Sequence, residues 1–425
     1  MKIAIIGSGI SGLTCGYYLS RDHDVTLFEA NDYIGGHTAT VDVELEGSRY
    51  SVDTGFIVYN DRTYPNFIAL MNEIGVEGRP SQMSFSVRND SNGLEYNGHT
   101  LTTLFAQKRN WLNPKFYSFI FEILRFNRLV KECVDQTTGE NTLGDFLTSH
   151  RFSDYFCDNY ILPMGAAIWS STLADMRAFP LQFFARFFLN HGLLDVTNRP
   201  QWYVIKGGSR EYIKPLTKGF ADKIRLNSSV ESVSRDHAGV TVRVNGQTER
   251  FDQVIFACHS DQAKHLLADI SSVESEILSD LAYQPNEVVL HTDESLLPKR
   301  KAAWASWNYW LDGGEQEQSR PPTLTYNMNI LQHIQAPKTF CVSLNSSDQI
   351  DKDKILKSFV YHHPVFSRDS MAAQARRNEI NGLSRTWFCG AYWYNGFHED
   401  GVRSGLDVVR GIRLASETLQ SQGAA

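Results

Sequence analysis

Three glycines near the start of the chain, Gly7, Gly9 and Gly12, have the spacing of a loop that binds phosphate groups. In such a loop the first glycine permits a tight turn, the second lets the backbone approach a pyrophosphate, and the third lets a helix pack on a strand. Glu29 follows the loop by about 20 residues, where a carboxylate accepts hydrogen bonds from a ribose hydroxyl. These four residues together predict a dinucleotide site.

The elements that position these residues can be identified from their patterns. Residues 2–6 form a short apolar, β-branched run typical of a buried parallel strand, and residues 10–21 have the apolar spacing of a helix. A second strand is expected over 24–30 and ends at Glu29 and Ala30. The amides at the start of the helix, at Ile10 and Ser11, then point at the phosphates.

A second set of glycines bears on the identity of the dinucleotide. Gly35 and Gly36 follow the acidic residue by six and seven positions, and an alternating strand pattern over 41–60 passes through Gly55. A nicotinamide enzyme would continue into further units of strand and helix, whereas these glycines let backbone lie against an extended ligand. This part of the chain alone leaves FAD and NAD as alternatives.

The order of these motifs resembles the flavin-containing amine oxidase superfamily. The stretches that carry the resemblance are IIGSGISGL, LFEA, GGHT and VDTG. The superfamily also holds protoporphyrinogen oxidases, carotenoid desaturases and a less characterised group of bacterial FAD-binding oxidoreductases, which is the nearest match. The resemblance implies non-covalently bound FAD and an α/β fold, in which a Rossmann-like FAD-binding domain of the glutathione-reductase type is interleaved with an α+β substrate domain.

Later segments are similar to the points where chains of this family return to the FAD-binding domain. The glycine pair within 203–216 is one of them, and Val230 stands where the family binds adenine through backbone atoms. The resemblance implies that the FAD-binding domain comprises residues 1–80, 203–285 and 381–425. The substrate domain then comprises 81–202 and 286–380.

The glycine- and aromatic-rich stretch FCGAYWYNGFHEDGVRSG, residues 388–405, is similar to the segment that ends the FAD domain in this family. There, a strand ends in a glycine, an aromatic loop crosses the flavin, and a helix begins beneath the isoalloxazine, where its N-terminus stabilises negative charge. The alternative is a structural strand and helix with chance glycines. The resemblance assigns the following residues to the cofactor: Gly7, Gly9, Ile10, Ser11, Gly12, Glu29, Ala30, Gly35, Gly36, His37, Thr38, Gly55, Phe56, Val230, Gly390, Glu399, Gly401 and Val402.

Two departures from amine oxidases concern the catalytic residues. Phe397 stands where monoamine oxidases carry a tyrosine of an aromatic cage, and Glu287 aligns, within one or two residues, with their lysine near flavin N5. No lysine occurs in 283–293. Both departures argue against amine substrates. The candidate catalytic residues are Phe397, His398, Tyr394 and Glu287, and the side chain of His398 either contacts the flavin or turns away from it.

The aromatic stretches 116–126 and 179–194 have two interpretations. They are core helices, or they form the wall of a cavity for a long apolar substrate or a face that lies on a membrane. The nearest bacterial group accompanies methyltransferases like cyclopropane fatty acid synthase, which implies work on fatty acyl chains. We therefore expect dehydrogenation or desaturation of an apolar, fatty-acyl or lipid-like substrate, with oxygen, a quinone or a partner protein as electron acceptor. The alternatives are an amine oxidase producing hydrogen peroxide and a redox-neutral flavin-dependent isomerase.

Composition excludes several classes of protein. The net charge of −7 and the lack of a basic stripe argue against nucleic acid as a partner. The six cysteines include no CxxC pair, and the histidines lack the spacing of metal ligands, so no metal site is expected. No apolar run approaches the ~20 residues of a membrane-spanning helix. These features predict a cytoplasmic enzyme. If the enzyme contacts a membrane, the contact is expected to be peripheral.

Overall fold

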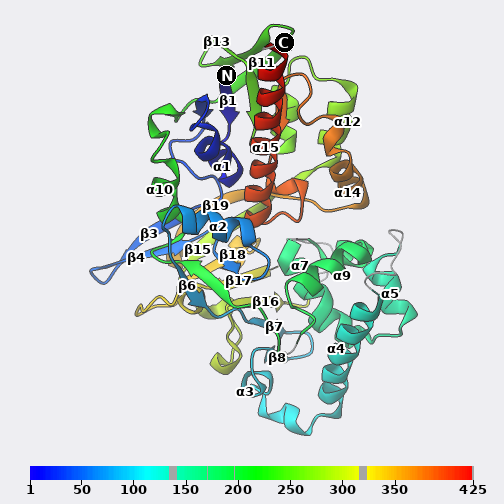
Figure 1. The fold of residues 1–425 in the computed structure, drawn as a ribbon. Coiled ribbons are helices and arrows are strands. Elements are labelled where there is room, and N and C mark those ends of the chain that lie inside the picture. The colour runs from blue at the N-terminus through cyan, green and yellow to red at the C-terminus, as the bar shows by residue number, and fades with distance from the viewer. Residues whose placement is uncertain (134–140, 170, 196, 315–322, 424–425) are drawn as a thin grey trace.

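The computed structural model describes residues 1–133, 141–169, 171–195, 197–314 and 323–423 (Figure 1). Two large sheets organise the chain, as the predicted α/β fold requires. The first is a five-stranded parallel sheet in the order β10-β2-β1-β14-β20. Its strands are β1 (Lys2–Ile6), β2 (Asp24–Phe28), β10 (Ile224–Arg225), β14 (Gln253–Phe256) and β20 (Thr386–Phe388).

Both faces of the parallel sheet are covered, which explains why its strands are almost wholly apolar. Ile3 and Ile5 pack against α1 (Ile10–Leu19) and α15 (His398–Gly423), which lie side by side in Figure 1. Ala4 and Ile6 face the opposite way, towards an antiparallel meander. The strands of the meander are β11 (Val230–Asp236), β12 (Gly239–Val244) and β13 (Gln247–Phe251).

The second large sheet has seven strands in the order β19-β15-β18-β17-β16-β7-β8. All its neighbouring strands are antiparallel except β16 and β7. The strands are β7 (Phe85–Asn89), β8 (Leu94–Asn97), β15 (Tyr283–His291), β16 (Trp307–Leu311), β17 (Thr323–Asn327), β18 (Cys341–Leu344) and β19 (Ile355–Pro364).

Smaller sheets join the two regions. In one, β9 (Trp202–Ile205) lies between β5 (Val58–Asn60) and β6 (Gly78–Ser81), so the chain crosses between the regions as paired strands. The other consists of β3 (Thr40–Leu45) and β4 (Ser48–Asp53).

Asp53 accepts hydrogen bonds from the Ser209 backbone amide at 2.8 Å and from the Gln332 side chain at 2.9 Å, and burial raises the pKa of its carboxyl to about 6. This one side chain therefore ties three separate segments together.

A helical region extends from the seven-stranded sheet at the end of the molecule opposite to the termini (Figure 1). It contains α3 (Leu101–Leu104), α4 (Pro114–Cys133), α5 (Leu143–Ser149), α6 (Asp154–Phe156), α7 (Leu162–Trp169), α8 (Leu173–Ala178) and α9 (Leu181–Asn190). The remaining helices are α2 (Pro65–Glu73), α10 (Ile213–Thr217), α11 (Ser260–Leu266), α12 (Ser272–Asp280), α13 (Met328–Leu331) and α14 (Arg368–Ala375). No helix in the described part of the chain is both long and apolar enough to cross a bilayer.

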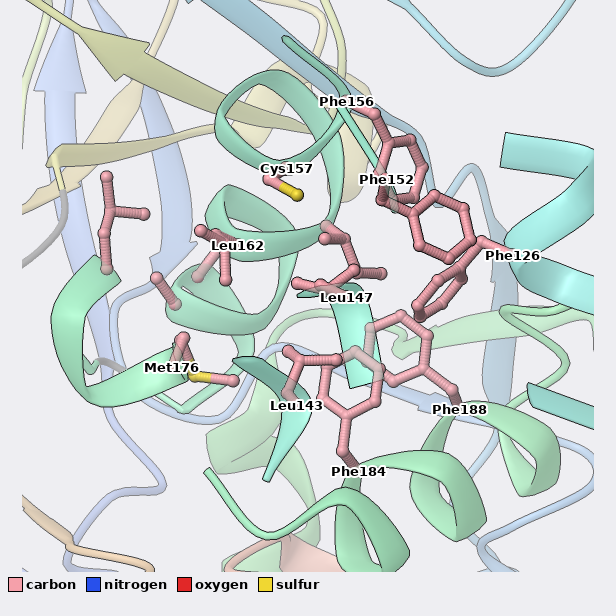
Figure 2. Close-up of a cluster of buried hydrophobic side chains, with 14 of the residues drawn as sticks. Phe126, Leu143, Leu147, Phe152, Phe156, Cys157, Leu162, Met176, Phe184 and Phe188 are labelled. Atoms are coloured by element: carbon pink, nitrogen blue, oxygen red, sulfur yellow. The ribbon is translucent and has the colours of Figure 1, made fainter. Parts of the chain in front are cut away.

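Most aromatic residues of the helical region pack in its core. Figure 2 shows Phe184 and Phe188 of α9 beside Phe126 of α4, and all three side chains are fully buried. Phe184 and Phe188 are stacked with ring centroids 4.0 Å apart. Of the two interpretations of 116–126, the structure favours the core helix over the cavity wall, because the buried rings fill this core and none of the segment lines the cavity described below.

Candidate active site

A continuous cavity of about 1550 Å³ runs from the carboxyl ends of the parallel strands into the helical region. One half is formed by loops of the parallel sheet and is called the nucleotide half. The other is formed by α7, α9 and strands of the seven-stranded sheet and is called the substrate half. The cavity is thus built from segments that are far apart in the sequence.

The three glycines of the first loop have three different surroundings. A Cβ atom added to Gly7, whose φ is +104°, would lie 2.7 Å from the carbonyl oxygen of Ala257, and one added to Gly12 would lie 2.1 Å from that of Gly7. These two glycines allow close packing. A Cβ atom on Gly9 would meet nothing within 4 Å, and Gly9 lines the cavity. The space over Gly9 is therefore open to a ligand.

Glu29 follows β2 directly, and its buried carboxylate is hydrogen-bonded through both oxygens. One carboxylate oxygen accepts from the Ser8 amide at 2.9 Å and from the Ser8 hydroxyl at 2.5 Å, and the other accepts from the Asn31 amide at 2.9 Å. This network fixes the carboxylate beside the glycine loop. Ser8 and Asn31 also line the cavity, although neither is among the residues predicted from the sequence.

The nucleotide half fits an extended dinucleotide. Open space over Gly9, the start of α1 and a fixed carboxylate are the features that pyrophosphate and ribose require. The predicted cofactor residues that line the cavity are Gly7, Gly9, Ile10, Ser11, Glu29, Ala30, Gly35, Gly36, His37, Gly55, Phe56, Val230 and Gly390.

Five predicted cofactor residues do not line this cavity, and one of them is Gly12, the packing glycine of the first loop. Glu399 instead accepts hydrogen bonds from the amides of Asn66 and Phe67 and so caps α2. Gly401 is a packing glycine, because a Cβ atom there would lie 2.6 Å from the Ile10 side chain and push α15 from α1. The remaining two are Val402, which is buried in the core around α1, and Thr38, whose hydroxyl pairs with that of Tyr212.

Two predicted catalytic residues are also misplaced. Glu287 lies on the exposed face of β15, where it pairs with the Ser347 hydroxyl, and it does not line the cavity. Tyr394 points away as well, because its hydroxyl donates to Asp407 at 2.5 Å. Neither side chain is in a position to contact a substrate in the cavity.

Phe397 and His398 do line the cavity, at the start of α15. The ring of Phe397 stacks on that of Phe187 with centroids 5.1 Å apart. The ring of His398 stacks on Phe56 at 3.7 Å, and its Nε2 lies 2.6 Å from the Tyr212 hydroxyl. Burial lowers the pKa of His398 to about 3. This engaged, neutral imidazole favours the alternative in which His398 turns away from the flavin.

The first turn of α15 carries a buried carboxyl group. Asp400 accepts a hydrogen bond from the Phe397 amide at 2.9 Å, and burial raises the pKa of Asp400 to about 7. The interaction closes the helix start immediately beside the cavity wall. The predicted effect of this helix N-terminus on a reduced flavin remains a prediction.

Histidines gather where the two halves meet. The ring of His37 lies 6.2 Å from that of His259 and 5.7 Å from that of His363, and His362 lies 6.0 Å from His259. Burial lowers the pKa of His37, that of His259 to about 4 and, with the neighbouring imidazoles, that of His363 to about 3. The buried Nε2 of His37 has no hydrogen-bond partner among the described residues. Only His37 is predicted from the sequence as a cofactor residue, because the other three histidines are distant in the chain.

The substrate half is mainly aromatic and aliphatic. Its wall includes Tyr160, Met164, Ala167, Ile168, Trp169, Phe187, His191, Leu193, Trp307, Tyr326, Leu344, Phe359 and Phe366. His191 Nδ1 lies 2.9 Å from the Phe187 carbonyl oxygen, which only accepts, so Nδ1 carries the proton. Burial lowers the pKa of His191 to about 4, so this imidazole is neutral.

Charged groups are rare on the wall. Among the described lining residues, the carboxylates are Glu29 and Asp261, and both follow strands of the parallel sheet. The described lining includes one arginine, Arg199, which is exposed and donates to the Asp195 carbonyl, and no lysine. The described substrate half therefore offers no anionic partner to a cation.

Curated relatives with similar sequences come from two functional groups. A 15-cis-phytoene desaturase of Synechococcus elongatus is 34% identical over 88 residues, which are 20% of this chain and 18% of the desaturase. A protein of Mycobacterium tuberculosis named as a flavin-containing monoamine oxidase, AofH, is 24% identical over 269 residues, which are 59% of this chain and 55% of AofH. The chain thus matches less than two thirds of the length of either relative.

Solved structures share the fold over almost the whole chain. Cyclohexylamine oxidase from Brevibacterium oxydans has a TM-score of 0.69 at 15% identity and covers 98% of this chain and 99% of its own. A fatty acid isomerase from P. acnes that produces CLA also has a TM-score of 0.69 at 15% identity, and covers 96% and 97%. At such identities the likeness shows a common fold.

The family assignment comes from the sequence. The family model described as flavin-containing amine oxidoreductase matches residues 10–335, more than half of the chain. The match is consistent with the nucleotide half of the cavity, whose residues fit a dinucleotide. The chain therefore belongs to the flavin-containing amine oxidoreductase family, whose cofactor is FAD.

Proposed function

We propose that this enzyme dehydrogenates a long apolar substrate of the fatty-acyl or lipid type, removing one hydride and one proton from its carbon chain. Bound FAD supplies the acceptor for the hydride. The observation that carries the proposal is the wall of the substrate half, which has aromatic and aliphatic side chains and, in the described lining, neither a carboxylate nor a lysine. Such a wall orients a hydrocarbon chain and excludes water.

The energetics of burial favour an acyl chain in this space. Each methylene moved from water into an apolar site contributes about 0.8 kcal/mol, so eight methylenes contribute roughly 6 kcal/mol without a charged anchor. Phe187 and Phe397 form a stacked aromatic wall near the start of α15, in the same cavity that Gly390 and Gly55 line. A chain held against this wall would lie beside the end of the cofactor site that is expected to hold the isoalloxazine.

For an amine, the free energy of entering this cavity is unfavourable. A protonated amine must lose its hydration to enter an apolar cavity, and the loss is offset only by a carboxylate, a dipole or an aromatic cage. The imidazoles of His191 and His363 are neutral because burial lowers their pKa values to about 4 and about 3, and they carry no negative charge. Phe397 also lacks the hydroxyl expected of an amine-oxidase cage.

Amine oxidation with release of hydrogen peroxide is the second candidate. It is favoured by the 24% identity to AofH and by the aromatic character of the wall, which would attract a cation. A redox-neutral isomerase of unsaturated chains is a third candidate, since the same cavity would hold the same substrate. For the proposed reaction we expect oxygen, a quinone or a partner protein to take the electrons.

Product analysis separates these candidates. The holoenzyme is incubated with a panel of fatty acids, phospholipids and amines, and the products are analysed by mass spectrometry. Dehydrogenation predicts a fatty-acyl product lighter by two hydrogens. An aldehyde with hydrogen peroxide would favour the amine oxidase, and a fatty acid of unchanged mass with a moved double bond would favour the isomerase. Either result would overturn the proposal.

A further inference from the structure

Helix α4 carries apolar side chains on two opposite faces. Phe116, Phe119 and Phe126 are fully buried in the core of the helical region, as an amphipathic helix requires. A second stripe, with Phe121 and Leu124 exposed to 65% and 49%, points outward at i and i+3. The fold explains the inner stripe, because its side chains pack in the core. It does not explain the outer stripe, whose side chains face solvent.

Further exposed apolar residues lie close by in the chain, on α3 and between α3 and α4. Leu101 on α3 is exposed to 71%, and Trp111 and Leu112, between α3 and α4, are exposed to 53% and 91%. With Tyr117, Phe121 and Leu124 these residues are called the α3–α4 surface. They are six of the twelve large apolar side chains that are markedly exposed in the described part of the chain. Exposed apolar groups gathered in this way mark an interaction site.

The segment of the chain that carries this surface is basic, although two of its basic side chains are paired, Arg128 with Glu132 and Lys131 with Asp195. Residues 101–132 contain six lysines and arginines and two glutamates, whereas the chain as a whole has a net charge of −7. Long basic side chains beside exposed tryptophan and leucine are the composition of a face that lies in the headgroup region of an anionic membrane. Trp111 is held in place by stacking on Phe105, with centroids 4.0 Å apart.

The α3–α4 surface adjoins the cavity. Gly98 and His99 line the cavity and are themselves exposed, and they precede the start of α3 by three and two residues. The cavity therefore reaches the molecular surface next to Leu101. In Figure 1, α3 and α4 lie at the end of the molecule opposite to α1 and both termini.

We infer that the α3–α4 surface docks on a lipid bilayer that contains anionic lipids, and that the opening at Gly98 and His99 takes an apolar substrate from that bilayer. The use of the opening rests on the proposed function, whereas docking does not. Basic side chains would attract the bilayer and Trp111, Leu112 and Phe121 would insert among the headgroups. Docking of this kind is reversible, because only side chains on the protein surface enter the headgroup region.

Vesicle flotation of the holoenzyme tests the inference. Vesicles of phosphatidylcholine with phosphatidylglycerol are compared with phosphatidylcholine alone and with raised salt. We expect binding to the anionic vesicles that weakens as salt screens the charges. The double variant Leu112→Glu, Phe121→Glu should reduce binding by at least about 10-fold, because it removes two inserting groups and adds negative charge. Both side chains are mostly exposed, so the fold should be kept, as measured by FAD content.

The matched control is Leu383→Glu, which changes a side chain exposed to 55% in the FAD-binding region and should bind vesicles like the wild type. Absence of wild-type binding, or equal binding by the double variant, would overturn the inference. A concentration-dependent dimer that the double variant abolishes, without vesicle binding, would assign the surface to a second copy of the chain and also overturn it. Reduction of the flavin by detergent-dispersed fatty acids is measured separately, so failure to dock and failure of the proposed function are distinguishable.

Discussion

The nucleotide half of the cavity is lined by glycine backbone and hydrogen-bonded polar side chains. The substrate half is lined mainly by aromatic and aliphatic side chains. In the nucleotide half, Gly9 leaves space and Glu29 is fixed by Ser8. In the substrate half, Trp307 and Phe187 come from a strand and a helix that are far apart in the sequence. The first arrangement recognises one polar ligand closely, whereas the second excludes water and selects by shape and length.

The difference explains why the cofactor and the substrate differ in how readily they can be inferred. A pyrophosphate requires amides in a fixed order, which a short motif encodes. An apolar chain requires only volume and dry walls, which many combinations of residues supply. Changes in the nucleotide half should therefore act on FAD alone, and changes in the substrate half on the apolar substrate alone.

The largest effect is expected from Gly9→Val. The side chain would enter the open space over the loop, so the protein should fold but retain FAD at least about 100-fold less tightly, equivalent to about 2.8 kcal/mol. Titration of apoprotein with FAD, followed by flavin fluorescence, measures the change. Gly219→Val is the control, since a Cβ atom there also meets nothing within 4 Å. Equal affinity in both variants would contradict the assignment of the loop.

Glu29→Ala should weaken FAD binding by ~1.5–3 kcal/mol, the value for a hydrogen bond to a charged group. The spectrum of the flavin that remains bound should not change, because Glu29 lies at the nucleotide end. Ser8→Ala is the companion variant, since it removes the hydroxyl that donates to Glu29 and leaves the carboxylate. Unchanged occupancy of Glu29→Ala at limiting FAD would show that the carboxylate does not hold the ribose.

Ile168→Trp tests the substrate half. Ile168 is half-buried on α7 and lines the cavity, so a larger ring there should displace about two methylenes of a long chain, or about 1.6 kcal/mol. Fatty acids of long chain length should bind about 15-fold more weakly, with short chains and FAD unaffected. Perturbation of the flavin absorbance reports binding, and Leu356→Trp, outside the cavity, is the control. A loss that is equal for all chain lengths would refute the assignment.

The smallest effect on FAD and substrate binding is expected from Asp400→Asn, at the start of α15 and outside the cavity, because this change should act on stability instead. The folded-state pKa of Asp400, about 7, lies above the unfolded value of about 3.9, so the stability from the neutral carboxyl is complete below 3.9 and is lost as the pH rises through 7. The asparagine of the variant does not titrate, so the variant does not lose stability in this way as the pH rises. Its unfolding free energy relative to the wild type should rise by at most about 1.4 kcal/mol per pH unit within this window. Denaturant unfolding at several pH values measures it, and a parallel pH dependence of the two proteins would disprove the buried neutral carboxyl.

Local motifs explain what the sequence predicts correctly. The glycine loop, Glu29 and the apolar strands each require residues within a short stretch, and they appear in the structure as expected. Glu287 was misplaced because a resemblance over a short strand does not show which of its residues, if any, reach the cavity. Its neighbours Asn286 and Val288 are both buried.

Other parts depend on tertiary contacts that the sequence does not show. Glu399 caps α2 by a bond to Phe67, 332 residues away in the chain. On α9, the phase of the helix turns Phe184 and Phe188 into the core but Phe187 to the cavity. Neither outcome follows from residue type, because all three phenylalanines suit both places.

The most direct test of the central claim is anaerobic reduction of the flavin. The holoenzyme is mixed without oxygen with detergent-dispersed fatty acids and phospholipids, and in parallel with benzylamine and spermine, while the visible flavin absorbance is recorded. An uncharged, aromatic substrate half predicts that a fatty-acyl compound bleaches the flavin and that the amines do not. Faster bleaching by an amine than by every lipid would contradict the account and assign the cavity to amine oxidation.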